Sequence, residues 1–320
     1  MDSAELQKLA ERTRSVREAG FALLLASGIL ALFLFIPLGP RSQTPNASPG
    51  SLTSASTTPD AFANISIEAA AAIAYDLATG EVLYTKNADA QLPLASLTKL
   101  LTVYAALATL SPSTPVTVPA SATNLEGPRA FSKGQTFALF DIARLTLTAS
   151  LNDGAAAIAE ATAERQQTSQ SAMLAGAAAA LNLSQTFAVN GTGLDVNAAI
   201  SGGYGSAHDL AVLAGALVAH APDIAAATTL NTVQAVSEGG TSVRVANTDP
   251  IINSVPRLLL SKTGYTDLAG GNLALVFDAG IAHPIAVVVL GSSRTSRFTD
   301  GMTLVAATLA HFAGVTSVSL

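Results

Sequence analysis

Three short segments of the sequence combine hydroxyl groups with amines in patterns that could support nucleophilic catalysis. In the first, Ser96 precedes Lys99 by three positions at the start of an apolar run that predicts a helix. Residues three apart share a helix face, so the amine can reach the hydroxyl. The lysine can take the serine proton only if burial or nearby positive charge lowers its pKa towards neutrality. The alternative is a serine that caps the helix and an ordinary lysine.

The second segment is Ser150-Leu151-Asn152, at a break between two predicted helices. Its alternative interpretation is a capping box formed by Ser150 with Asp153. The third is Lys262-Thr263-Gly264, at the end of a strand-like run, where the glycine would let another backbone lie against the strand. The alternative is a solvated strand end. In this order the segments describe a nucleophile, an amine base, a hydroxyl relay and a carboxylate clamp.

The composition excludes several other kinds of chemistry. The 320 residues contain 49% hydrophobic and 12% charged residues, which excludes general disorder. The net charge of −6 argues against a nucleic-acid partner. The absence of cysteine excludes disulfides, thiol nucleophiles and iron–sulfur clusters. The four histidines have no metal-ligand spacing, so we expect neither a metal nor another cofactor.

The chain divides into four segments. Residues 19–38 form an uncharged apolar stretch whose helix would span roughly 30 Å, the thickness of a bilayer core. Four basic residues precede it, so we expect an uncleaved transmembrane helix with residues 1–18 in the cytoplasm. A cleaved signal peptide is the rival, but no small-residue cleavage site follows. Residues 39–64 have a linker composition, and residues 65–320 form one domain.

The domain is predicted to have strands at both ends and helices between them. The expected fold is α/β in the α+β sense, with one sheet completed by both ends and an inserted helical region. The expected strands are Ala71–Leu77, Glu81–Lys86, Arg257–Tyr265, Asn272–Phe277 and Ile285–Gly291. The expected helices are Leu97–Leu110, Phe140–Thr148, Asp153–Glu164, Ser171–Leu181, Ser206–His220 and Thr299–Ala313.

The three segments and their surroundings resemble the serine D-alanyl-D-alanine carboxypeptidases, the low-molecular-mass penicillin-binding proteins of the β-lactamase-like superfamily. They match the Ser-x-x-Lys, Ser-x-Asn and Lys-Thr-Gly motifs of that family. The flanking sequences PLASLTKLLT, ASLNDGAAAIAE and LLLSKTGYTDLAGGNLALV match as well, and so does the stretch from Phe187 to Asp195. The resemblance covers residues 68–313 and implies an antiparallel sheet in the transpeptidase-like fold.

The resemblance also implies roles for the residues of the first two motifs. Ser96 would be acylated by the penultimate D-Ala carbonyl of a peptidoglycan stem peptide, with Lys99 as general base. Ser150, held near Lys99, would pass a proton to the leaving D-Ala. Asn152 would bind the substrate amide. The central Leu151 is larger than the small residue common there, which leaves the peptide preference open.

The third motif and its neighbours would bind the other end of the substrate. In Lys262-Thr263-Gly264, the lysine and threonine would hold the terminal carboxylate, and Gly264 would belong to the substrate-binding residues, where it lets the peptide backbone lie against the strand. The backbone N–H groups of Ser96 and Tyr265 would form the oxyanion hole. Arg294 resembles a second carboxylate contact, although Arg297 could serve instead.

The resemblance implies a place in the cell and a set of partners. We expect a single-pass protein of the bacterial plasma membrane, with the catalytic domain outside the cytoplasm. Its partners would be the stem peptide, β-lactam antibiotics as acylating inhibitors, and membrane lipid around residues 19–38.

The sequence leaves two alternative functions, a β-lactamase and a non-catalytic wall-binding protein, and one alternative site, a Ser–His–Asp triad. A β-lactamase of the same fold would need a water-activating glutamate, but no Glu-x-x-Leu-Asn occurs between Ser150 and Lys262. A non-catalytic wall-binding protein should first lose the nucleophile or the base, and both are present. His208 and Asp209 invite a Ser–His–Asp triad, but no nucleophile-elbow motif accompanies them, and a capped helix start is expected instead.

Overall fold

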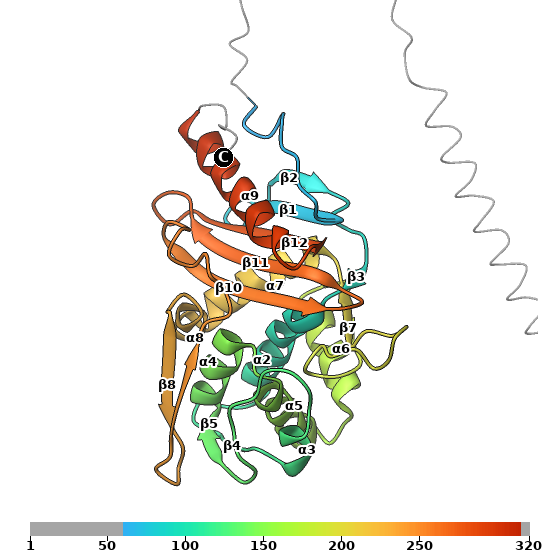
Figure 1. The fold of residues 1–320 in the computed structure, drawn as a ribbon, viewed down its shortest axis with the longest axis vertical. Coiled ribbons are helices and arrows are strands. Elements are labelled where there is room, and N and C mark those ends of the chain that lie inside the picture. Colours follow the sequence, from blue (N-terminus) through green and yellow to red (C-terminus); the bar gives the residue numbers. More distant parts are fainter. Residues whose placement is uncertain (1–59, 315–320) are drawn as a thin grey trace, which may run out of the picture. The chain divides into compact units, whose positions relative to one another are not determined.

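A five-stranded antiparallel sheet takes its strands from both ends of the part of the chain described by this computed structural model, residues 60–314 (Figure 1). The order is β10-β11-β12-β1-β2, and β1 pairs along its whole length with β12. The strands are β1 (Ala71–Asp76), β2 (Val82–Lys86), β10 (Leu258–Thr266), β11 (Gly270–Asp278) and β12 (Pro284–Ser292). The prediction of one sheet completed by both ends of the domain is confirmed.

The two faces of the sheet pack into two separate hydrophobic cores. Successive side chains of a strand point to opposite faces, so Ile73 and Val288 join the core shared with the helical region. Ala72 and Val287 join the core beneath α9 (Ser296–Ala313). Burial on both faces explains why β12 reads as an unbroken apolar run rather than an alternating one.

The inserted helical region contains the five helices that the sequence predicts. Their bounds agree with the expected ones to within two residues at each end. They are α2 (Thr98–Thr109), α4 (Leu139–Ala149), α5 (Asn152–Gln166), α6 (Gln170–Ala180) and α7 (Ala207–His220). At the start of α7 the Ser206 hydroxyl accepts the Asp209 backbone N–H at 3.0 Å. The capped helix start is therefore confirmed, and His208 instead lies 3.2 Å from Asp89.

Several short elements do not appear in the sequence prediction. Strands β8 (Thr232–Val236) and β9 (Ser242–Ala246) form a hairpin with alternating burial, just before β10. The others are β3 (Leu92–Pro93), α3 (Ala120–Thr123), β4 (Pro115–Thr117), β5 (Thr136–Ala138), β6 (Phe187–Ala188), β7 (Gly203–Gly205) and α8 (Pro222–Ala227). Most are shorter than the window over which hydrophobic periodicity can be recognised.

The predicted transmembrane helix at residues 19–38 and the cytoplasmic segment before it lie outside the described residues. Between residues 60 and 314, no helix is long and apolar enough to cross a membrane. The end of the predicted linker packs onto the domain: Ala61 is buried, and the Phe62 ring stacks on Tyr84 with 5.9 Å between centroids. Residues 61 and 62, which the sequence assigns to the linker, therefore pack against the domain.

Candidate active site

Ser96 lies in a short 3₁₀ turn, η1 (Ala95–Leu97), that leads directly into α2. Ala95 has a φ of 48°, in the left-handed region that costs a non-glycine residue about 1–3 kcal/mol. Gly193 packs so closely against this turn that a Cβ at position 193 would lie 1.9 Å from the Ala95 carbonyl oxygen. Leu97 is the N-cap residue of α2 and no side chain caps that helix, so the interpretation of Ser96 as an N-cap is wrong. The surrounding structure holds the strained turn and thereby fixes the position of the hydroxyl.

Lys99 is fully buried one helical turn after Ser96. Its Nζ lies 2.7 Å from the Ser96 Oγ and donates to the Thr192 carbonyl oxygen, also at 2.7 Å. Burial lowers the pKa of Lys99 to about 7, against the opposing charge of Asp153. A large share of the amine is therefore unprotonated near neutral pH, as a base for the serine requires.

Ser150 ends α4 rather than capping the helix that follows. It has a φ of 57°, in the left-handed region, and its side chain is buried. Leu151 is the N-cap residue of α5, and no side chain caps that helix. The Asp153 carboxylate instead accepts the backbone N–H groups of Ala130 and Phe131, both at 2.8 Å. The capping-box interpretation of Ser150 is therefore wrong.

Lys262, in the Lys-Thr-Gly motif, is hydrogen-bonded to Ser150 in the Ser-x-Asn motif. Its Nζ lies 2.8 Å from the Ser150 Oγ and 2.7 Å from the Thr263 carbonyl oxygen. Burial lowers the pKa of Lys262 well below its ordinary value, and the nearby cations Lys99 and Arg297 lower it further. We expected Ser150 next to Lys99, whereas the hydrogen bond described for its hydroxyl is to Lys262.

Gly264 allows the turn η1 (Ala95–Leu97), which carries Ser96 and is called the nucleophile turn below, to lie against β10, the edge strand of the sheet. A Cβ at this position would lie 3.0 Å from the Leu94 carbonyl oxygen and 3.3 Å from the backbone nitrogen of Ser96. Both distances are tighter than ordinary contacts with a Cβ. The sequence predicts that a substrate backbone lies against the strand at Gly264, whereas the backbone found next to this glycine is that of the turn carrying Ser96. The strand and the turn form one wall of the site.

Asn152 lies in the first turn of α5 with only 2% of its surface exposed. Its Nδ2 donates to the Glu126 carbonyl oxygen at 2.6 Å. Its Oδ1 is buried and has no hydrogen-bond partner. An acceptor without a donor is costly inside a protein, so this oxygen is available to accept a hydrogen bond from a bound ligand.

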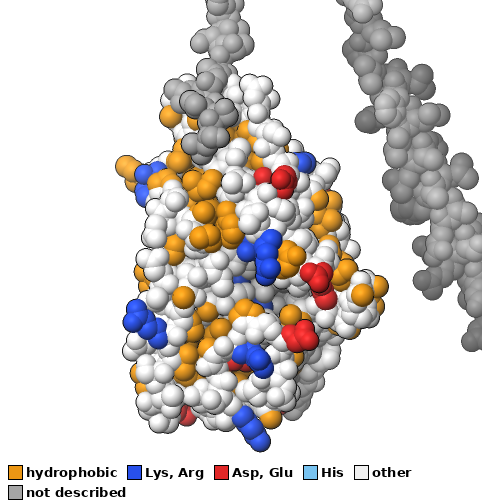
Figure 2. Space-filling model, viewed as in Figure 1, with side chains coloured by type: hydrophobic (Ala, Val, Ile, Leu, Met, Phe, Trp, Pro, Cys, Tyr) orange, Lys and Arg blue, Asp and Glu red, His pale blue; other side chains and the backbone are white. Residues whose placement is uncertain are grey.

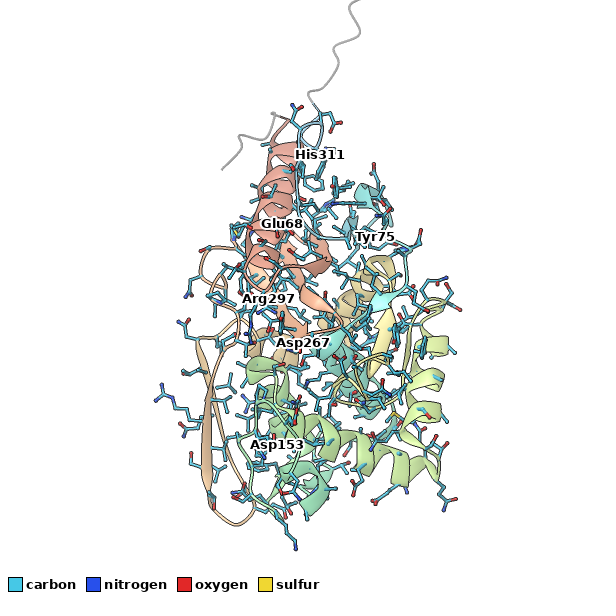
Figure 3. All side chains as sticks on the ribbon, turned by 45° about the vertical axis from the view of Figure 1, so that its right-hand side comes forward. Glu68, Tyr75, Asp153, Asp267, Arg297 and His311 are labelled. Atoms are coloured by element: carbon cyan, nitrogen blue, oxygen red, sulfur yellow. The ribbon has the colours of Figure 1, made fainter. Side chains whose placement is uncertain are left out.

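The two candidate arginines occupy different environments beside β10. Arg294 places its guanidinium over the Tyr265 ring, 4.5 Å from the centroid. Arg297, labelled in Figure 3, is nearly buried. It donates a hydrogen bond to the Gly264 carbonyl oxygen at 2.5 Å. Burial lowers the pKa of Arg297. Both therefore lie next to the third motif, Arg294 at the surface and Arg297 beneath it.

Several residues that support the site could not be predicted from the sequence. The Thr248 hydroxyl lies 2.6 Å from that of Thr263, and the buried Asp249 carboxylate accepts the Ser261 hydroxyl at 2.5 Å. The Asn190 side chain accepts the backbone N–H of Thr192 at 3.1 Å and so shapes the loop whose carbonyl binds Lys99. The stretch containing Asn190 carried a signal through its resemblance to the family. Thr248 and Asp249 carried none.

Comparisons with known proteins identify the family of this chain. A model of the D-alanyl-D-alanine carboxypeptidase family matches residues 54–294. A D-alanyl-D-alanine endopeptidase of Pseudomonas aeruginosa is 30% identical over 238 residues, which make up 73% of this chain and 74% of that protein.

Solved structures share the fold. Penicillin-binding protein D2 of Listeria monocytogenes, in its ampicillin-bound form, has a TM-score of 0.62 and 25% identity, covering 77% of this chain and 98% of its own. A D-alanyl-D-alanine carboxypeptidase of Mycobacterium tuberculosis H37Rv has a TM-score of 0.66 and 24% identity, covering 78% of this chain and 92% of its own. With the family match over most of its length, the chain belongs to the serine D-alanyl-D-alanine carboxypeptidases.

Proposed function

We propose that this protein removes the terminal D-alanine from peptidoglycan stem peptides through an acyl-enzyme on Ser96. The observation that carries the proposal is the 2.7 Å contact between the Ser96 hydroxyl and the buried amine of Lys99. An amine with a pKa of about 7 can take the serine proton at neutral pH, which an ordinary lysine cannot do.

The acylation step assigns roles to Ser96, Lys99 and Ser150. The Ser96 oxygen attacks the penultimate D-Ala carbonyl while its proton passes to Lys99. The oxyanion that forms is stabilised by the backbone N–H groups of Ser96 and Tyr265. When the peptide bond breaks, Ser150 gives its hydroxyl proton to the leaving D-Ala nitrogen. The proton that Lys99 accepted from Ser96 then replaces the one that Ser150 gave up, so Lys99 is neutral again and Lys262, which is hydrogen-bonded to Ser150, keeps its charge.

The third motif would bind the terminal carboxylate of the substrate. Lys262 is the cation and Thr263 the hydroxyl donor, and Arg294 adds charge from the surface. Burial and neighbouring cations lower the pKa of Lys262 in the free protein, whereas a bound carboxylate favours its charged form. The unpartnered Asn152 Oδ1 would accept an N–H of the peptide.

A two-part experiment tests the assignment. The full-length protein is incubated with a pentapeptide ending in D-Ala-D-Ala, and free D-alanine is measured. In parallel it is labelled covalently with a fluorescent penicillin. We expect both activities in the wild type and in Ser113→Ala, which changes an exposed serine outside the site. We expect neither in Ser96→Ala, and retention of both by Ser96→Ala would contradict the proposal.

The same experiment separates the alternatives. A β-lactamase would release the hydrolysed penicillin rapidly, whereas a carboxypeptidase would remain labelled. The sequence also lacks the Glu-x-x-Leu-Asn motif between Ser150 and Lys262 that would supply the water-activating glutamate of a class A β-lactamase. A wall-binding protein without catalysis would neither release D-alanine nor be labelled.

We also propose that residues 19–38 anchor the protein in the bacterial plasma membrane with the domain outside the cytoplasm. The support is the uncharged apolar stretch and the basic residues before it. Membrane fractionation of full-length protein, followed by protease treatment of spheroplasts, tests this placement. We expect the protein in the membrane fraction and the domain accessible to protease. Recovery in the cytoplasmic fraction would contradict the anchor.

A further inference from the structure

Arg297, at the start of α9, reaches β10 across the neighbouring strand β11. Its Nη1 donates a hydrogen bond to the Gly264 carbonyl oxygen at 2.5 Å, and its guanidinium lies over the Phe298 ring, 4.6 Å from the centroid. Gly271 of β11, which pairs with Tyr265, leaves room for this side chain, because a Cβ there would lie 3.2 Å from the Arg297 Cδ. The packing therefore directs the arginine to one backbone carbonyl.

The Gly264 carbonyl and the Tyr265 N–H belong to the same peptide group. In a trans peptide these two groups point in opposite directions, so the N–H points away from the guanidinium that binds the carbonyl. The nucleophile turn lies close to the same place, since a Cβ on Gly264 would be 3.3 Å from the Ser96 nitrogen. The contact with Arg297 thus fixes the direction of an N–H that the proposed function places in the oxyanion hole.

The group bound to this carbonyl is a buried positive charge. Only 9% of Arg297 is exposed. Burial lowers the pKa of Arg297, while the negative charge of Asp249 acts in the opposite direction. An arginine keeps its proton throughout the physiological pH range, so the guanidinium is a cation. A cation bound to an amide oxygen draws electron density from the amide nitrogen, and inside a protein this makes the N–H a stronger donor.

Arg294, three positions before Arg297, is placed differently. It is exposed, and its guanidinium lies over the Tyr265 ring. Figure 2 shows basic and acidic side chains around a hollow near the middle of this face. An exposed cation can meet a substrate carboxylate there, whereas the side chain of Arg297 is hydrogen-bonded to the protein backbone. The two arginines are therefore suited to separate tasks.

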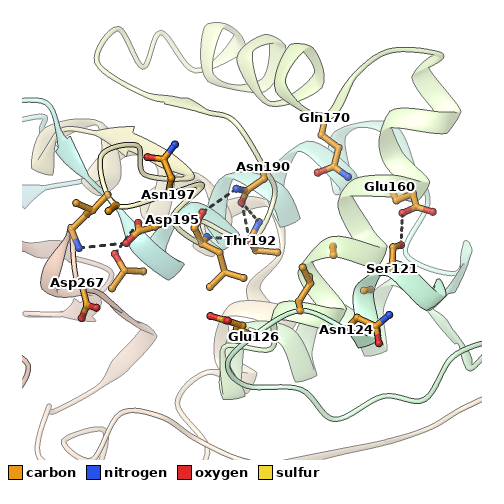
Figure 4. A pocket seen from close by; sticks show the side chains of 17 residues that line it. Ser121, Asn124, Glu126, Glu160, Gln170, Asn190, Thr192, Asp195, Asn197 and Asp267 are labelled. Carbon is orange, nitrogen blue, oxygen red and sulfur yellow. Dashed lines mark hydrogen bonds between the residues drawn. The ribbon is translucent and has the colours of Figure 1, made fainter.

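A second contact fixes the end of β10 just beyond Tyr265. The Asp195 carboxylate accepts the Thr266 hydroxyl at 3.1 Å and the Leu268 N–H at 3.4 Å (Figure 4). Arg297 thus binds the residue before Tyr265, and Asp195 binds the residue after it. A donor held in this way does not have to reorient when negative charge develops on the substrate.

We infer that Arg297 is a positioning residue of the oxyanion hole. Its guanidinium holds the Gly264–Tyr265 peptide group in place and polarises it, so that the Tyr265 N–H binds the developing oxyanion more strongly. The inference rests on the proposed function, which takes this N–H as one of the two oxyanion donors. It assigns Arg297 to the transition state of acylation and leaves the substrate carboxylate to the third motif and Arg294.

Two substrates with the same scissile carbonyl test the inference. One is a pentapeptide ending in D-Ala-D-Ala. In the other, benzyl thiol replaces the last D-Ala as a thioester, so the leaving group has no carboxylate, although an oxyanion still forms. In full-length Arg297→Gln, we expect kcat/KM to fall about 10- to 100-fold for both substrates. With penicillin, the limiting acylation rate should fall similarly, while the half-saturating concentration stays within about twofold.

Two other arginines provide the controls. Arg294→Gln removes the same charge three positions away. It should lower kcat/KM for the D-Ala-D-Ala peptide and spare the thioester, which has no carboxylate to bind. Arg244→Gln, which removes an exposed arginine of β9, should leave both substrates within about twofold of the wild type.

The infrared carbonyl stretch of the acyl-enzyme gives an independent readout. With penicillin labelled isotopically in its lactam carbonyl, the oxyanion hole should lower the ester frequency in the wild type. The frequency should be higher in Arg297→Gln, and Arg297→Lys, which keeps a cation on a shorter side chain, should lie between them with a smaller loss of rate. Thermal unfolding shows whether each variant is folded, and if Arg297→Gln is not, Arg297→Lys decides by the same criteria.

The outcomes distinguish this inference from the proposed function. A loss confined to the D-Ala-D-Ala peptide, a change below about twofold, or an unshifted ester frequency overturns the role of Arg297 while catalysis stands. Failure of the wild type both to release D-alanine and to be labelled by penicillin overturns the proposed catalysis, and the role of Arg297 with it.

Discussion

The Nζ of Lys262 lies 2.8 Å from the Oγ of Ser150, although 112 positions separate the two residues in the sequence. The contact joins the helical region to the edge strand of the sheet. It also gives the Ser150 hydroxyl a defined partner in the absence of substrate. The catalytic centre therefore depends on how these two parts of the fold are packed.

Replacing Ser150 with alanine should slow catalysis without unfolding the protein. The change removes the hydroxyl that we assign to proton transfer, so we expect acylation by penicillin to slow by about 10²- to 10⁴-fold. Stopped-flow acylation and the thermal midpoint of unfolding measure the two effects. A rate within twofold of the wild type would contradict the relay role.

The acylation rate should depend on pH through Lys99. Burial lowers the pKa of this amine to about 7, and only its neutral form can take the serine proton. The rate should therefore fall about tenfold for each pH unit below 7 and level off above it. Rates of penicillin acylation between about pH 5 and 9 test this. A flat profile below pH 7 would show that another group is the base.

Replacing Thr248 with valine should weaken recognition of the substrate carboxylate. The Thr248 hydroxyl is 2.6 Å from that of Thr263, so it helps to orient the group that we assign to carboxylate binding. Losing one neutral hydrogen bond should reduce the free energy of substrate binding by about 1 kcal/mol. We therefore expect KM to rise roughly fivefold, with a smaller change in kcat.

The control for this prediction is Thr248→Ser, which keeps the hydroxyl and should restore KM. In a Thr263→Val background, Thr248→Val should add little, because the group it orients is gone. Full additivity of the two changes would argue that Thr248 acts on stability alone.

Introducing a Cβ at Gly264 should separate the nucleophile turn from β10. The new atom would lie 3.0 Å from the Leu94 carbonyl oxygen and 3.3 Å from the Ser96 nitrogen, and both are backbone atoms. We expect Gly264→Ala to reduce acylation by at least tenfold, because oxyanion geometry tolerates little displacement. Gly176→Ala in α6, where a Cβ meets nothing within 4 Å, is the matched control and should leave the rate unchanged.

Much of the fold and of the site could be predicted from the sequence because the decisive signals are local. The Ser96 and Lys99 pair follows from helical spacing, and the long apolar runs predict the helices and the strands of the main sheet. What the sequence could not predict depends on tertiary packing. Thr248 and Asp249 lie in a polar turn without periodicity, and only the folded chain brings them beneath β10.

The capping-box interpretation of Ser150 shows the same limit. The spacing from Ser150 to Asp153 fits a local cap, but the Asp153 carboxylate is used by the backbone of Ala130 and Phe131. A tertiary hydrogen bond outcompetes the local one, and Ser150 is left to contact Lys262. No pattern within the tripeptide carries this information.

The pairing of β1 with β12 has a consequence for how the protein is made. The ribosome releases β1 early, yet its neighbour on one side is among the last strands to be synthesised. Until then the nucleophile turn also lacks β10, the wall that holds it in place. We therefore expect that penicillin does not acylate a nascent chain until nearly all of the chain has left the ribosome. The ability to be acylated should then appear late and in a single cooperative step.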